Sequence, residues 1–274
     1  MKKLTTVALA LCLGVSGMAL AGCGENGGNE NEVYISGSTS VQPLMEKLAA
    51  AFEAKHEDIV ITVDGGGSGK GITDAQDGLN DFGMSSRALK SSETGVKGVT
   101  MATDGIALIV NPECEIDDVT NDEVYHLYAD GTAIGGVLTA AISRESGSGT
   151  RGAFDELVVN EAGDALVDLT GFADCVQTQN STGNVMTQIA TKGNTNLLGY
   201  ISMGSVDDTV KVLKYNGVEA TVENVVAGNY SLSRPFVIVV KEGAELSEAA
   251  QMFYDYIFSE EGQTIVEQNG YIKI

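Results

Sequence analysis

The sequence predicts an α/β protein in which mainly parallel sheets are flanked by helices. Four times along the chain, an apolar strand-like run leads through a Gly/Ser/Thr loop into residues with helical periodicity. The composition is that of a globular protein, with 43% hydrophobic residues. About 240 residues follow the N-terminal leader, more than one compact domain usually holds, so two domains are expected.

The strand–loop–helix units lie, in order, at 33–52, 59–79, 137–158 and 179–189. In the first unit, Pro43 falls in the opening turn of the helix, where a missing N–H is tolerated. In the second unit, the helical spacing extends to Leu79. Near the C-terminus, the apolar pattern of 249–257 predicts a helix that packs back onto the first domain.

Residues 1–22 form a secretory signal peptide, in which two lysines precede an apolar run. Cys23 follows directly, and this ending resembles the bacterial lipobox, whose cysteine is lipidated and becomes the mature N-terminus. Acylation, with palmitate among the chains, would hold the protein on the extracellular face of the cell membrane without spanning it. Residues 23–32 are then a lipidated, flexible tether. An ordinary secreted protein with an incidental cysteine is the alternative.

The net charge limits the possible partners. The formal charge is −22, and removal of Lys2 and Lys3 with the leader leaves 14 basic against 38 acidic residues. Nucleic acid is not expected as a partner, because phosphate backbones need a basic footprint. A small anion is not excluded, since oriented N–H groups act at contact distance whereas surface charge is screened beyond about 8–10 Å.

No metal site and no cofactor are predicted. The histidines, His56 and His126, lie far apart in the sequence, and the cysteines form no CxxC pair. After loss of the leader, Cys114 and Cys175 remain beside Cys23, and the sequence leaves open whether they form a disulfide.

The stretch DGGGSGKGI at 64–72 has the look of a nucleotide-binding loop. With Gly69-Lys70 aligned on that motif, Asp64 replaces its first glycine and Gly71 replaces its magnesium-binding hydroxyl, so both ends fail. What remains is a glycine-rich turn at a helix start, where an anion can bind. Helix capping explains each such loop singly, but three of them with one embedded arginine favour a binding site.

Seven motifs resemble those of the phosphate-binding lipoproteins that serve phosphate ABC transporters. They are SGSTSVQPL at 36–44, GGGSGKGI at 65–72, DFGMSSR at 81–87, DGIALIVNP at 104–112, SRESGSGTR at 143–151, STGNVMTQI at 181–189 and LGYISMGSV at 198–206. The resemblance implies the two-lobed periplasmic-binding-protein fold with two hinge strands. It also implies that inorganic phosphate is captured between the lobes and delivered to the membrane permease, and a monomer is expected.

By the same resemblance, three loops supply the groups that hold phosphate. The donors are Ser38, Thr39, Ser40, Ser68, Ser148, Gly149 and Thr150. Arg144 would add a charge-assisted contact. The alternative for Arg144 is a surface ion pair with Glu145 or Asp155.

One position departs from the family pattern. Some members have an aspartate where this chain has Ser86, and that carboxylate takes a proton from phosphate and rejects unprotonated sulfate. Ser86 can still accept a hydrogen bond, and Asp104 is a candidate substitute. Selectivity therefore stays open, with sulfate, molybdate or tungstate as alternative ligands. Arg87 either reaches the anion or braces its loop.

The strands that cross between the lobes are expected at 106–111 and 236–240. Residues 33–106 and 238–274 then form the first lobe, and 107–237 the second. An enzyme is not expected, although Gly147-Ser148-Gly149 loosely resembles a hydrolase nucleophile loop. Glu145 replaces a glycine of that motif, and both histidines lie in charge-rich helical stretches typical of exposed side chains.

Overall fold

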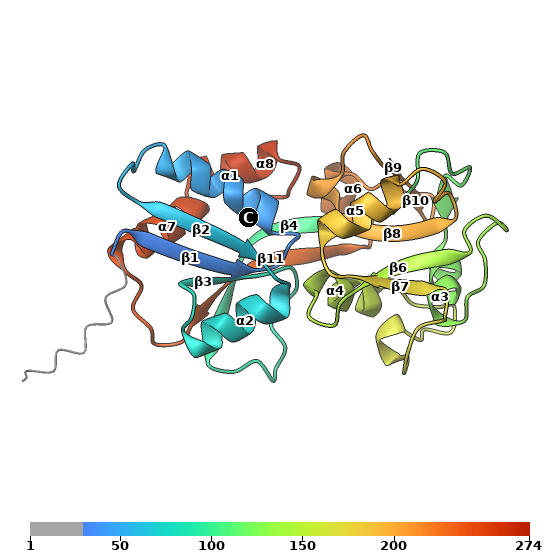
Figure 1. The fold of residues 1–274 in the computed structure, drawn as a ribbon, viewed down its shortest axis with the longest axis horizontal. Helices are drawn as coiled ribbons and strands as arrows, with labels where there is room; N and C mark the ends of the chain where they lie inside the picture. The colour runs from blue at the N-terminus through green and yellow to red at the C-terminus, as the bar shows by residue number, and fades with distance from the viewer. Residues whose placement is uncertain (1–29) are drawn as a thin grey trace, which may run out of the picture.

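The structure is a computed structural model that describes residues 30–274. Two α/β lobes lie side by side and are joined by long strands that run through both (Figure 1). The signal peptide and the lipidation site Cys23 lie outside the described residues. No helix within 30–274 is both long enough and apolar enough to cross a membrane.

The first lobe contains the strand order β2-β1-β3-β11-β4. The strands are β1 (Glu32–Gly37), β2 (Val60–Gly65), β3 (Phe82–Ser85), β4 (Val96–Val110) and β11 (Ser233–Lys241). The helices are α1 (Gln42–Glu53), α2 (Ser68–Asp77), α7 (Glu248–Phe258) and α8 (Glu260–Gln268). β1 is parallel to β2 and β3, whereas β11 is antiparallel to β3 and β4.

The second lobe continues the sheet in the order β4-β8-β6-β7, with β9 also on β4. Its strands are β6 (Ala140–Arg144), β7 (Val176–Gln179), β8 (Leu197–Ser202) and β9 (Lys211–Val212), beside a small sheet of β5 (Asp118–Val119) and β10 (Lys214–Tyr215). Its helices are α3 (Asn121–Ala129), α4 (Gly149–Leu157), α5 (Thr182–Ala190) and α6 (Val222–Val226), with short 3₁₀ turns η1 (Leu166–Asp168) and η2 (Met203–Ser205). The sheet is therefore mixed. β1 and β2 in the first lobe and β6 and β7 in the second, which begin the strand–loop–helix units, are parallel to their neighbours. β4 and β11, which join the lobes, are antiparallel to theirs.

Local sequence explains where the helices begin and end. Pro43 lies in the first turn of α1, as expected. α2 ends at Gly78, whose φ of 72° is the left-handed conformation that glycine adopts easily. Leu79 therefore falls outside the helix and is 64% exposed. The buried face of α2 ends at Ala75, one turn before the apolar spacing in the sequence predicts.

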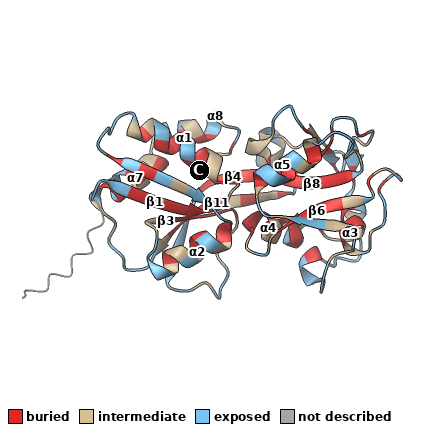
Figure 2. Cartoon of the chain, in the orientation of Figure 1, coloured by how far each residue is buried: buried red, intermediate tan, exposed pale blue. Residues whose placement is uncertain are grey.

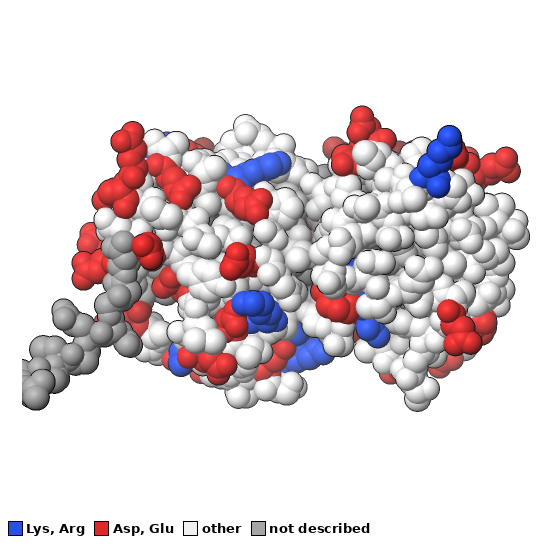
Figure 3. Space-filling view, viewed as in Figure 1, with Lys and Arg blue, Asp and Glu red and all other residues white. Residues whose placement is uncertain are grey.

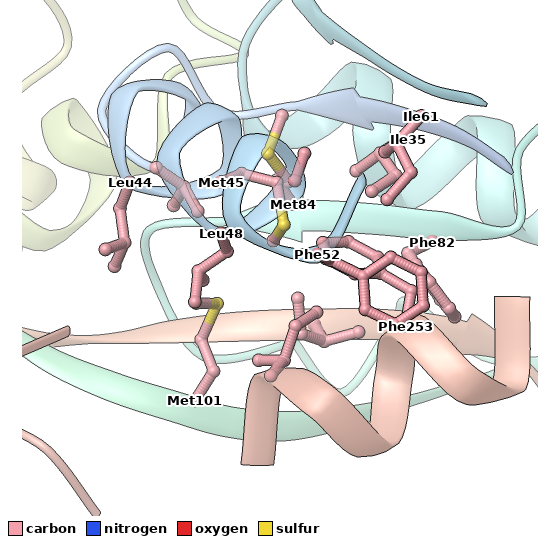
Figure 4. Packing of buried hydrophobic residues seen from close by; sticks show 14 of the residues in the cluster. Ile35, Leu44, Met45, Leu48, Phe52, Ile61, Phe82, Met84, Met101 and Phe253 are labelled. Atoms are coloured by element: carbon pink, nitrogen blue, oxygen red, sulfur yellow. The ribbon is translucent and has the colours of Figure 1, made fainter. Parts of the chain in front are cut away.

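Each lobe has its own main hydrophobic core and a smaller buried cluster beside it. Side chains from α1, the sheet and α7 fill the first core, where Leu48, Phe52 and Phe253 pack together (Figure 4). The second core is rich in aromatic rings, and Phe154 stacks on Tyr200 with a centroid separation of 3.9 Å. Buried residues run along the long strands through both lobes (Figure 2).

The cores divide where β4 and β11 pass between them. Ala102 and Phe236 pack in the first core, whereas Ile106 and Leu232 pack in the second. We call residues 102–106 and 232–236 the crossover. The return crossing was expected at 236–240, but β11 residues from Phe236 onward pair with the first-lobe half of β4, so the chain re-enters the first core earlier.

Both remaining cysteines are free thiols in the structure. Cys114 is buried in the second core, and the Cys175 thiol donates to the Leu127 carbonyl at 3.7 Å. The disulfide that the sequence left open is not formed.

Candidate anion-binding site

Four helices begin at the junction of the two lobes. α1 and α2 flank it from the first lobe, and α4 and α5 flank it from the second (Figure 1). Each follows a parallel strand, namely β1, β2, β6 and β7, so each loop leaves the carboxyl end of its strand. Helix N-termini present unpaired N–H groups and partial positive charge, which together favour an anion.

Hydroxyl groups from both lobes meet at this junction and form a connected set. We call it the hydroxyl cluster; its members are Ser38, Thr39, Ser40, Ser68, Ser86, Thr150 and Thr182. The Ser40 Oγ lies 2.9 Å from the Thr150 Oγ1 and 3.1 Å from the Thr182 Oγ1, on the opposite lobe. All members except Thr39 are buried, so the lobes are closed on one another here.

Ser86 connects the loops of the first lobe. Its N–H donates to the Ser68 Oγ at 3.0 Å, and its own Oγ accepts from the Ser38 Oγ at 2.9 Å. The Ser68 Oγ also lies 3.4 Å from the Ser86 Oγ, where either hydroxyl can donate, so the Ser68 hydrogen can point to Ser86 or turn to an anion. The three serines are at most 2% exposed.

Arg144 carries a positive charge into the same place. It is the last residue of β6 and is only 1% exposed, and its Nη2 donates to the Thr39 Oγ1 at 3.1 Å. The guanidinium also makes a two-pronged ion pair with Glu145, at 2.9 Å for both contacts. The pairing with Glu145 thus exists, but it is not a surface pair: Arg144 is buried beside the hydroxyl cluster. Asp155 pairs with Arg151 instead.

The start of α4 completes the second-lobe side. The Ser148 Oγ caps the helix by accepting from the Arg151 N–H at 3.2 Å. Gly149 and Thr150 are the first helical residues, so their N–H groups have no partner within the helix. Gly149 lies so close to the first lobe that a Cβ added to it would fall 2.2 Å from the Ser68 Oγ.

Two candidate residues have other roles in the structure. The Asp104 carboxylate makes no hydrogen bond to the hydroxyl cluster; it is buried against Arg234, Oδ2 to Nη2 at 3.1 Å, and accepts from the Ser202 Oγ at 2.9 Å. Burial raises the pKa of Asp104 to about 6, against the opposing attraction of Arg234. Arg87 forms an ion pair with Glu93 at 2.6 Å and donates to a neighbouring carbonyl, so it braces its loop.

Sequence reasoning missed Thr182 and Arg234. Thr182 opens α5, is 4% exposed and lies within hydrogen-bond distance of Ser40 in the first lobe. The signal for it was present, because the QNSTGN loop had been identified as a helix start of the same kind as the other three. Arg234 precedes Pro235 in a strand and belongs to no motif, so only the fold reveals its place.

The chemistry of the site suits a small oxygen-rich anion. Within residues 30–274, no group of three His, Cys, Asp or Glu side chains is placed to hold a metal ion. His126 is half-exposed on α3 with its Nδ1 2.8 Å from Asp130, and His56 stacks on Phe52; within residues 30–274, neither ring is hydrogen-bonded to Ser148. Acidic side chains are spread over both lobes on the face shown in Figure 3, and basic ones form no continuous patch there. The attraction for an anion is therefore local and internal.

A two-lobed α/β fold that closes hydroxyls, helix N-termini and an arginine between its lobes defines a solute-binding protein. The chain belongs to the PBP superfamily, whose domain model matches residues 24–261. Among named relatives, it is 30% identical to the phosphate-binding protein PstS of Bacillus subtilis over 88% of this chain and 80% of the relative. It is 47% identical to the phosphate-binding protein PstS 2 of Streptococcus agalactiae, but that match covers only 48% of this chain and 45% of the relative.

Solved structures show the same relationship over longer stretches. A putative phosphate ABC transporter substrate-binding protein from Clostridium perfringens, crystallised with bound phosphate, is 41% identical. The similarity covers 89% of this chain and all of that one, with a TM-score of 0.81. An ABC-type phosphate transport receptor from Vibrio cholerae is 30% identical over the same shares, with a TM-score of 0.68.

Proposed function

We propose that this chain captures inorganic phosphate between its two lobes and delivers it to the permease of an ABC transporter. One observation carries the proposal: the hydroxyl cluster and Arg144 form a closed, buried donor site that needs groups from both lobes. A ligand held in this way favours the closed form, because only that form makes all the contacts. The phosphate bound in the 41% identical Clostridium protein supports this choice of ligand.

The proposed lobes follow the expected boundaries, 33–106 with 238–274 and 107–237, except that the return crossing precedes Phe236. The donors proposed to touch the anion are the hydroxyl cluster, Arg144, Ser148 and the N–H groups of Gly149 and Thr150. Asp104 does not belong to this set, because Arg234 and Ser202 occupy its carboxylate. The protein acts as a monomer and is not an enzyme.

The proposal places the protein outside the cell, anchored to the membrane by lipid on Cys23. The lipobox-like sequence before Cys23 supports the anchor. Metabolic labelling with a palmitate analogue tests it: the wild type should incorporate label and Cys23→Ala should not. Label that is retained in Cys23→Ala would remove Cys23 as the lipidation site.

Calorimetric titration of phosphate tests the binding function directly. The soluble chain from residue 30 onward is unfolded and refolded to remove bound ligand, and phosphate and sulfate are titrated in parallel. We expect one-to-one binding of phosphate and little response to sulfate. Folded protein that gives no heat with phosphate would refute the proposal.

A second candidate is the same fold with another oxyanion, such as sulfate, molybdate or tungstate. It is favoured by the serine at 86 and by the pairing of Glu145 and Asp104 with arginines. Both carboxylates are thus engaged by arginines, whereas telling phosphate from sulfate needs an acceptor for the hydrogen bond that only protonated phosphate donates. Equal or tighter binding of sulfate in the same titration would select this candidate.

A further inference from the structure

An ion pair lies at the crossover, outside the donor set. Asp104 of β4 and Arg234 of β11 are directly opposite one another in the antiparallel register. Their Oδ2 and Nη2 atoms are 3.1 Å apart, and the two side chains are at most 1% exposed. The pair therefore occupies the place where the chain passes from one core to the other.

The pair has contacts on both sides of the crossover. Towards the second lobe, Asp104 accepts from the Ser202 hydroxyl of β8 at 2.9 Å. Towards the first lobe, the Arg234 Nη1 donates to the Ser86 carbonyl at 3.4 Å. Arg234 thus connects the crossover to a member of the hydroxyl cluster.

Ser86 has a partner for each of its polar groups. Its N–H donates to Ser68, its hydroxyl accepts from Ser38, and its carbonyl accepts from Arg234. The first two contacts tie Ser86 to groups that themselves belong to the cluster. The β3–β11 ladder ends at Ser85, which faces Val237, and the contact with Arg234 extends the tie to β11 by one residue, to the Ser86 carbonyl.

Stability alone is a weak reason for such a pair. Moving two charges out of water offsets most of their attraction, so a buried ion pair often stabilises a fold no more than apolar side chains would. The raised pKa of Asp104 reflects that opposition, because burial outweighs the neighbouring guanidinium. A role in orienting Ser86 accounts better for the place of the pair, which contacts the Ser86 carbonyl.

We propose that Arg234, held by Asp104, is a positioning residue of the anion site that sets the orientation of Ser86. Arg234 does not touch the anion in this proposal; it acts through the Ser86 carbonyl. The inference rests on the proposed function, since it assigns a role in anion binding to a residue outside the donor set.

A double-mutant cycle between Arg234 and Ser86 tests the proposal. Anion affinity is measured by calorimetry for the wild type, Arg234→Met, Ser86→Ala and the double variant. Loss of a hydrogen bond to a charged group weakens binding about tenfold or more, and we expect Arg234→Met to approach that loss. In the Ser86→Ala background, Arg234→Met should change the affinity less than about twofold, because the group it positions is gone.

Controls separate positioning from general damage. Lys214→Met removes an exposed cation that pairs with Glu219, outside the donor set, and should leave the affinity unchanged. Arg234→Met combined with Ser148→Ala, on the opposite lobe, should show additive losses. Thermal unfolding without ligand records any loss of stability, which need not follow the losses in affinity.

Two outcomes would overturn the inference: unchanged affinity in Arg234→Met, or a loss that persists in full in the Ser86→Ala background. If Arg234→Met does not fold, Asp104→Asn takes its place in the cycle, because it keeps the shape of Asp104 and removes the charge that holds Arg234. The titrant is phosphate, or sulfate if the wild type prefers it. If the protein binds another anion, only the titrant changes. If the inference about Arg234 is wrong, the effects of Arg234→Met and Ser86→Ala on affinity are not coupled, whichever anion is titrated.

Discussion

The close approach of α4 to the first lobe can be tested with one methyl group. In Gly149→Ala, the added Cβ would lie 2.2 Å from the Ser68 Oγ and 2.8 Å from the Ser86 Oγ. Non-bonded atoms do not approach so closely, so either Ser68 turns away or the lobes stay apart. The φ of Gly149 is not in the left-handed region, so alanine is compatible with the helix itself.

The size of the effect follows from these contacts. Forcing an extra carbon into a packed contact costs about 1–3 kcal/mol. Turning the Ser68 hydroxyl away removes a hydrogen bond to the anion, which costs about 1.5–3 kcal/mol. Since either response alone costs this much, phosphate affinity should fall at least about tenfold. Gly149 is the first residue of α4, where alanine is tolerated, so the second lobe should lose no stability.

The assay is calorimetric titration of phosphate, with thermal unfolding of the ligand-free protein measured beside it. Gly152→Ala is the matched control in the same helix, because its Cβ would meet only the flexible Arg87 side chain, at an ordinary 3.4 Å. The control should bind within about twofold of the wild type. Wild-type affinity in Gly149→Ala would show that the two loops do not meet when the anion is bound.

Substitutions at three further positions test other parts of the site and of the second lobe. Arg144→Lys keeps the charge but loses the planar fork that reaches Thr39 and Glu145, so phosphate affinity should fall at least about tenfold; an unchanged affinity would remove Arg144 from the site. Thr182→Val keeps the shape and loses the hydroxyl beside Ser40, so affinity should fall, and Thr182→Ser should restore it. Burial raises the pKa of Asp155 from 3.8 to about 6, so the folded protein binds the carboxyl proton more tightly than the unfolded chain does. The protonated carboxyl therefore stabilises the folded state fully below about pH 4, and this stabilisation is lost as the pH rises through 6. The shift of about two pKa units corresponds to about 3 kcal/mol, so Asp155→Asn should show a smaller fall in urea midpoint from pH 4 to pH 7 than the wild type, and an equal fall would contradict the assignment.

Local patterns predicted the elements that build the site. The loop before each of α1, α2, α4 and α5 contains glycine or hydroxyl residues that reveal a helix start in the sequence, and all four helices begin there. The apolar spacing gave no such guidance for Leu79, because the left-handed Gly78 ends the helix one residue before it.

Long-range pairing accounts for what the sequence did not reveal. Asp104 and Arg234 are 130 residues apart, and only the register of β4 with β11 places them together. Asp104 was therefore considered for the anion, although its partner is an arginine from another strand. The early return of Phe236 to the first core depends on the same register, which no local signal encodes.

The division of the cores also has a consequence for the order in which the chain can fold. The second core is built from one continuous stretch, whereas the first core needs Phe253, Ile257 and Tyr271 from the end of the chain. In a chain that emerges N-terminus first, the second core can be complete while the first still lacks its closing helices. We expect a chain that ends after Lys241 to keep a protease-resistant fragment within 106–232 and to lose protection of the N-terminal strands. Residues 248–271 would then supply the closing step of folding, and the anion site, which needs both lobes, would become functional only at that step.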